Sequence, residues 1–132
     1  MYWTIYWQNL HWLSINYPEN PNDNEKQQII NLIETMQNSG IQCSICRNHF
    51  IQWVQKNNIF DAIKNKKNLF AFFWGCHNEV NKRNGKEILS YDSAFNLYSE
   101  IFWRERLNKI VDIVALFKGN ELHRFPNLYN NY

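Results

Sequence analysis

The chain has few of the residues that interrupt helices, since its 132 residues include only four glycines and three prolines. Alternating β-branched residues are also scarce, which argues against a sheet-rich domain. No unbroken apolar segment is long enough to cross a membrane, and the opening stretch MYWTIYWQNLHWLSINYP has neither a basic start nor a small-residue cleavage site. We therefore expect an all-α protein without a signal peptide or a membrane anchor.

No charge of one sign dominates either, because 14 basic residues stand against 12 acidic ones, for a net charge of +2. So small an excess creates no field that would follow a nucleic-acid backbone, and we expect no nucleic-acid partner. The chain is long enough for one core, and it contains no internal repeat or low-complexity linker. Aromatic residues, by contrast, are abundant, with six Trp, seven Tyr and nine Phe. Such flat groups also suit a planar ligand.

Apolar residues at helical spacing predict the order of the helices. We expect helices over residues 4–17, 23–39, about 43–56 and 68–84, followed by a short fifth helix ending at Tyr98 and an amphipathic segment over 101–117. Asp23 is the expected cap of the second helix, and Ser90 or Asp92 that of the fifth. Gly85 is expected to end the fourth helix. The tail 119–132 is expected to be flexible.

Two of the three cysteines, Cys43 and Cys46, form a C-x-x-C pair. At the start of a helix, such a pair lies near unpaired N–H groups that stabilise a thiolate, and Arg47 adds a positive charge next to it. This indicates redox chemistry, although a thioredoxin fold would need strands that the pattern does not predict. A zinc site and a structural bridge are the alternatives. Zinc would need further ligands, and Cys76 and His77 point about 100° apart on a helix, so we predict no metal.

The fourth predicted helix turns from apolar to polar within FFWGCHNEVNKRNGK, residues 72–86. His77, Asn78 and Asn81 share one side of this helix, and Arg83 and Lys86 follow. One interpretation is a buried His77 satisfied by a backbone carbonyl, with both asparagines in solvent. The other is a ligand with hydrogen-bonding ring edges and phosphates. Without a G-x-G-x-x-G or Walker loop, side chains would have to hold such a nucleotide.

Three motifs in the same order resemble the Erv/ALR family of FAD-linked sulfhydryl oxidases. HNEVNKRNGK, residues 77–86, is similar to the family signature H-N-x-V-N-x-x-x-G-K. WQNLHWLSINYP, residues 7–18, matches W-x-x-x-H-x-x-x-x-x-Y-P, and CSICRNHF, residues 43–50, contains the C-x-x-C. The resemblance covers about residues 3–100. It implies a four-helix up-down bundle with a short fifth helix, and an FAD-binding domain that we place at residues 1–118.

The resemblance also implies the cofactor contacts of FAD. Trp7 and His11 would contact it from the first helix, and Cys46 would face the flavin ring. The remaining contacts would come from the later helices: His77, Asn78, Val80, Asn81, Arg83 and Lys86, the last two near the phosphates, with Tyr98 on the adenine side. The family usually has Trp at the position of Tyr98, an exchange that stacking tolerates.

The implied activity is the formation of disulfides in client proteins. A client dithiol, or a thiol carrier, would attack the Cys43–Cys46 disulfide at Cys43, and electrons would pass through Cys46 to FAD and on to molecular oxygen, giving hydrogen peroxide. The chain lacks the family's second disulfide and its shuttle cysteines, so we expect Cys76 to be a free, buried thiol. The basic residue that often precedes the first-helix Trp is replaced around Thr4.

Several further expectations follow from the resemblance. Family members pair through their first two helices, so we expect a homodimer with a C2 contact that includes Ile5 and Trp12. The segment 101–117 could instead cover the bundle or add to the core. The small size resembles the forms of large DNA viruses, which implies the host cytoplasm or a virion assembly site; the mitochondrial intermembrane space is the alternative. The rival function is a non-enzymatic helical interaction module with a structural or metal-binding C-x-x-C.

Overall fold

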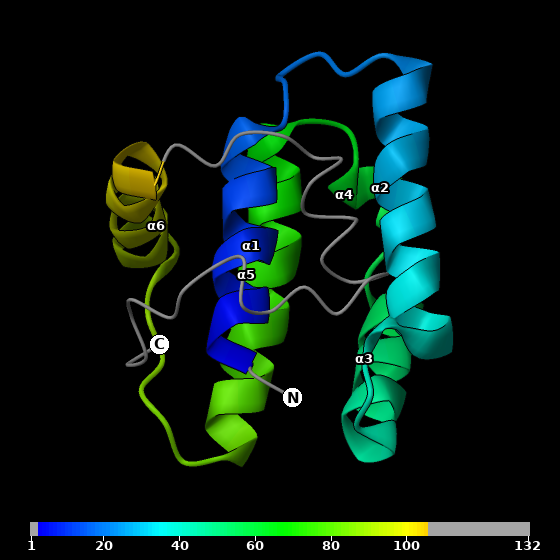
Figure 1. Ribbon diagram of the computed structural model, residues 1–132, viewed down its shortest axis with the longest axis vertical. Helices are drawn as coiled ribbons and strands as arrows, with labels where there is room; N and C mark the ends of the chain where they lie inside the picture. Colours follow the sequence, from blue (N-terminus) through cyan, green and yellow to red (C-terminus); the bar gives the residue numbers. More distant parts are fainter. Residues whose placement is uncertain (1–2, 106–132) are drawn as a thin grey trace.

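The computed structural model describes residues 3–105, with side chains described from Tyr6 to Glu100 (Figure 1). Every regular element in this part is helical, so the all-α prediction is confirmed. The elements are α1 (Trp3–Asn16), α2 (Asp23–Thr35), the π-helical turn η1 (Met36–Gly40), α3 (Ser44–Lys56), α4 (Ile59–Ala62), α5 (Lys66–Arg83) and α6 (Tyr91–Glu105).

Helix α1 is the central element of the fold. It packs along α5, with α2 and α3 on one side and α6 on the other (Figure 1). Every side chain from Tyr6 to Ile15 is buried, including polar Gln8, Asn9 and Ser14. The sequence predicted that only one face of this helix points inward. The buried part of α1 is larger than predicted. Neighbouring helices cover α1 on all sides, so its polar residues have no solvent face and are buried as well.

The start of α2 differs from the prediction by one residue. Asn22, not Asp23, is the N-cap: its Oδ1 accepts the backbone N–H of Glu25 at 2.8 Å. The Glu25 carboxylate in turn accepts the N–H of Asn22 at 3.0 Å, which completes a capping box. The box satisfies two backbone donors that the first helical turn leaves without partners.

The end of α5 and the start of α6 agree with the sequence. Gly85 follows α5 with a φ of 67°, a left-handed conformation that glycine adopts without steric cost. Ser90 precedes α6, and its Oγ accepts the N–H of Ser93 at 3.1 Å. Helix α6 is longer than predicted, because it continues past Tyr98 to Glu105. The rest of the segment 101–117 and the tail 119–132 lie outside the described residues.

Helix α6 covers a second, smaller core beside the main one. Trp12 and Phe70 pack there against Ala94 and Tyr98. Trp12 is only 2% exposed, so the prediction that it forms a dimer contact was wrong: α6 already covers it. The side chain of Ile5 lies outside the described part. No helix within residues 3–105 combines the length and the hydropathy that a membrane span requires.

Candidate functional site

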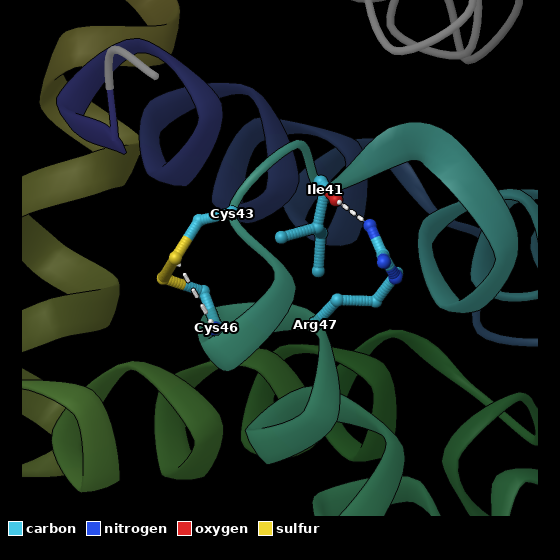
Figure 2. Close-up of a disulfide and its surroundings, with 4 residues drawn as sticks. All are labelled: Ile41, Cys43, Cys46 and Arg47. Atoms are coloured by element: carbon cyan, nitrogen blue, oxygen red, sulfur yellow. Dashed lines mark hydrogen bonds between the residues drawn. A yellow bond between two sulfur atoms is a disulfide. The ribbon is translucent and has the colours of Figure 1, made fainter.

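Cys43 and Cys46 form a disulfide at the start of α3, with their Cα atoms 5.2 Å apart (Figure 2). Cys43 is the N-cap of this helix, and its sulfur accepts the backbone N–H of Cys46 at 3.3 Å. Both cysteines are half-buried, so a thiol can approach from solvent. The helix start was predicted at Cys43 or Ser44, and α3 begins at Ser44. Free N–H groups at such a position stabilise a sulfur anion.

Arg47 does not lie beside the sulfurs as the sequence suggested. Its guanidinium donates a hydrogen bond to the carbonyl oxygen of Ile41 at 2.8 Å. Figure 2 shows its side chain and the disulfide on opposite sides of the turn. The stabilisation of a thiolate here therefore rests on the helix N-terminus rather than on Arg47.

A cavity of about 200 Å³ lies directly behind Cys46. Residues of α1, η1, α3 and α5 line it, and most of them are apolar or aromatic: Trp7, Met36, Ile41, Ile45, Phe50, Trp53, Cys76 and Val80, together with the polar His49, Glu79, Arg83 and Asn84. Cys46 is part of this wall, whereas Cys43 is not. The two sulfurs of the disulfide therefore have different surroundings.

His77 reaches the cavity wall through Trp7 rather than directly. The rings of Trp7 and His77 stack at a centroid distance of 4.2 Å and an interplanar angle of 5°. On its other side His77 Nδ1 lies 2.9 Å from Nε2 of His11, and one of the two nitrogens donates to the other. The alternative, a His77 satisfied by a backbone carbonyl, does not describe this contact. His11 in turn stacks on Tyr98, with centroids 4.2 Å apart.

Burial keeps both imidazoles neutral. Loss of solvent lowers the pKa of His11 from its ordinary value of 6.5 to about 3. Burial lowers the pKa of His77 further, and the nearby His11 and Lys86 lower it in addition. A neutral imidazole has one donor and one acceptor nitrogen, so one ring of the pair can donate a hydrogen bond that the other accepts.

The two asparagines of the signature hold the segment that follows α5. Asn78 Nδ2 donates to the carbonyl of Leu89 at 2.9 Å, and Asn81 Nδ2 donates to that of Glu87 at 3.1 Å. The carbonyl of Asn81 also accepts the N–H of Lys86 at 2.8 Å. Asn81 is 3% exposed, so it does not lie in solvent, as one of the two interpretations of the sequence supposed. These bonds give both residues a structural role in holding residues 87–89 against α5, and neither of them lines the cavity.

The two basic residues that were predicted to lie near the phosphates, Arg83 and Lys86, are both exposed. Arg83 borders the cavity and is the last residue of α5, and Lys86 lies three residues after it. Among the site residues predicted from the sequence, the structure thus groups Trp7, His11, His77 and Tyr98 in one stack, and it places Cys46, Val80 and Arg83 around one cavity.

Several residues of the cavity wall were not predicted as site residues. Trp53 packs against Gly75 so closely that a Cβ on Gly75 would lie 2.8 Å from Cη2 of the indole. Cys76 is free and buried, as predicted, and it also borders the cavity. Burial raises the pKa of its thiol from 9.0 to about 12. No sequence motif marks Trp53 or Gly75, because their contact joins two helices that are distant in the chain.

Within residues 3–105, no three His, Cys, Asp or Glu side chains form a group that could hold a metal ion. The disulfide also engages the two sulfurs that a zinc site would have needed.

Comparison with known proteins gives a consistent result. The sequence profile of the Erv1 / Alr family matches residues 4–103. FAD-linked sulfhydryl oxidases of two African swine fever virus isolates are 31% and 30% identical over 99 residues, which is 72% of this chain and 77% of theirs. A protein of Invertebrate iridescent virus 3 is 26% identical over 93 residues, 70% of this chain and 62% of its own. The chain therefore belongs to the Erv1/Alr family.

Proposed function

We propose that this protein is an FAD-linked sulfhydryl oxidase that forms disulfides in client proteins. The observation that carries this proposal is the asymmetry of the disulfide: Cys46 borders an aromatic cavity, while Cys43 does not. This difference supports Cys43 as the sulfur that a client attacks and Cys46 as the sulfur that faces a cofactor. The names of the viral relatives support the same activity and the same cofactor.

The residues around the cavity fit a flavin ring. Trp7, Phe50 and Trp53 present flat apolar surfaces, and the buried histidine pair beside them carries no charge. A cavity of about 200 Å³ takes only part of a molecule as large as FAD, since whole ligands usually occupy about 300–1,000 Å³. The rest of the cofactor would lie outside it, with Arg83 and Lys86 near the phosphates.

The adenine side is proposed at Tyr98. This side chain is 2% exposed and stacks on His11, so it contacts an adenine only after the two rings separate. Asn78, Val80 and Asn81 complete the proposed contacts from α5, the two asparagines mainly by fixing the backbone near Leu89 and Glu87.

The thiol steps follow from the positions of the two sulfurs. A client thiolate bonds to Sγ of Cys43, the Cys43–Cys46 bond breaks, and Cys46 leaves as a thiolate. The second client thiol then attacks the client sulfur of the mixed disulfide with Cys43, which releases the Cys43 thiol and the client disulfide. The client has lost two electrons and two protons. A bound FAD would supply the two-electron acceptor that returns the cysteine pair to its disulfide, with oxygen and two protons as the source of hydrogen peroxide.

Partners and location are proposals as well. We propose client protein dithiols, or a thiol carrier, as electron donors. We also propose a homodimer, through a surface that does not include Trp12. The viral relatives support a viral protein that acts in the host cytoplasm.

An absorption spectrum and one cysteine series test the oxidase. The purified protein is expected to show a flavin spectrum and to consume oxygen with dithiothreitol. Cys46→Ser is expected to abolish this consumption and to retain FAD, whereas Cys76→Ala, which removes the cysteine outside the disulfide, is expected to keep turning over. A colourless protein, or normal turnover in Cys46→Ser, would refute the assignment.

A further inference from the structure

Ile45 has the most exposed large apolar side chain in the part of the chain that the structure describes, at 68%. It lies between the two cysteines, in the first turn of α3. One part of the side chain borders the cavity next to Cys46, most of it faces solvent, and its neighbours Ser44 and Asn48 are exposed and polar. An isoleucine at such a position leaves apolar surface in water that a partner could cover with a gain in free energy.

The chemistry of the site determines what covers this surface. An attacking thiolate has to bond to a sulfur of the disulfide, so the client backbone has to cross the turn that contains Cys43. Neighbouring residues of the client lie about 3.8 Å apart, and one helical turn rises about 5.4 Å. A side chain next to the client cysteine is therefore within reach of Ile45.

The charged side chain on this turn is not directed toward a client at the disulfide. Arg47 is directed at the carbonyl of Ile41, away from the disulfide (Figure 2). Glu79 and Arg83 border the cavity from α5 and carry opposite charges. An apolar centre with a polar surround is the usual arrangement of a small protein-binding site.

We propose that Ile45 is a specificity-determining residue, which selects client thiols that have an apolar neighbour in the protein chain. The inference rests on the proposed oxidase function and specifies its substrate class: cysteines in apolar segments of proteins rather than small polar thiols. Ile45 takes no part in bond making, and its side chain packs against the client residue while the thiol reacts at Cys43.

Two reduced dithiol peptides test the proposal. They are identical except that the residue beside the attacking cysteine is Leu in one and Ser in the other. The wild-type enzyme is expected to prefer the Leu peptide about tenfold in kcat/KM, which is about 1.4 kcal/mol. Ile45→Ser is expected to reduce the preference below about threefold, since it removes most of the apolar surface that the Leu contacts.

Phe60→Ser is the matched control, because Phe60 is 66% exposed and lies on α4. It is expected to keep the tenfold preference. Dithiothreitol, which has no neighbouring side chain, reports the chemical step in each variant. Should serine perturb the start of α3, Ile45→Thr repeats the comparison with a side chain of similar shape.

The outcomes are separable. A preference that persists in both Ile45 variants, or that Phe60→Ser abolishes equally, overturns the inference and leaves the oxidase in place. A wild-type enzyme without preference does the same. A loss of dithiothreitol and peptide turnover in equal measure would assign Ile45 to the cofactor cavity or the chemical step instead and overturn its role in selection. A wild-type protein that does not oxidise dithiothreitol overturns the proposed function and this inference together.

Discussion

Cys76 differs from the other two cysteines in its surroundings and hence in its reactivity. It is buried among apolar residues near the middle of α5, and burial raises the pKa of its thiol to about 12. Only a thiolate reacts with alkylating reagents at a useful rate. A pKa three units above the ordinary value of 9.0 lowers the thiolate fraction at neutral pH by roughly a thousandfold.

We therefore expect the native protein to resist a maleimide at neutral pH under non-reducing conditions. After unfolding, one thiol per chain is expected to react, because the other two cysteines remain in the disulfide. Mass spectrometry of the labelled chain measures both states, and Cys76→Ala serves as the blank. Rapid labelling of the folded wild-type chain at this residue would show that its thiol is accessible.

Single residues could be predicted from the sequence where a local motif determines their chemistry. The C-x-x-C pair at a helix start is an example, whereas the free, buried Cys76 was expected from the resemblance to a family whose second disulfide this chain lacks. The direction of Arg47 could not be predicted, because it depends on the path of the backbone at Ile41. The partner of His77 could not be predicted either, since His11 lies 66 residues away in the sequence.

At the scale of elements, the contact between α3 and α5 depends on a missing side chain. A Cβ on Gly75 would lie 2.8 Å and 2.9 Å from two carbons of the Trp53 indole. In an isolated helix, alanine in place of glycine stabilises by about 1 kcal/mol. Here the clash costs about 1–3 kcal/mol, so Gly75→Ala is expected to be neutral or to destabilise by up to about 2 kcal/mol.

A double-mutant cycle measured by urea unfolding distinguishes the two effects. In a Trp53→Leu background the clash is absent and only the helix propensity remains, so Gly75→Ala is expected to stabilise that background by up to about 1 kcal/mol. Equal effects of Gly75→Ala in both backgrounds would mean that the indole moves away without cost.

The helices themselves could largely be predicted, whereas their exact limits and environments could not. Spacing of apolar residues located the longer helices, and Ser90 and Gly85 marked two ends. The one-turn helix α4, Ile59–Ala62, is too short to show a period. The burial of α1 on all sides depends on α6, and no pattern in the sequence indicated that α6 packs against Trp12.

At the scale of the whole molecule, the histidine pair couples stability to pH. His11 belongs to α1 and His77 to α5, and Tyr98 of α6 stacks on the pair, so it joins three helices. Burial lowers the pKa of both rings well below 6.5, to about 3 for His11. In the unfolded chain both rings regain an ordinary pKa and take up protons below about pH 6.5.

The sign of the effect follows from this difference. Below about pH 6.5 the unfolded chain binds more protons than the folded one, so the free energy of unfolding decreases as the pH falls toward 3. Each buried histidine lowers the free energy of unfolding by about 1.4 kcal/mol for every pH unit of acidification once the pH is well below 6.5. From about pH 7.5 to about pH 5, the pair is expected to lower the free energy of unfolding by about 4 kcal/mol.

Urea unfolding of the chain without added FAD measures this slope. His77→Asn leaves one buried histidine and is expected to halve the decrease to about 2 kcal/mol over the same interval. Ile33→Val is the control: Ile33 is fully buried, and the change costs about 0.5–1.5 kcal/mol without altering any titrating group, so it lowers stability equally at both pH values. If wild type and His77→Asn lose the same stability on acidification, the neutral pair does not link these three helices to pH, and the acid sensitivity must come from other groups.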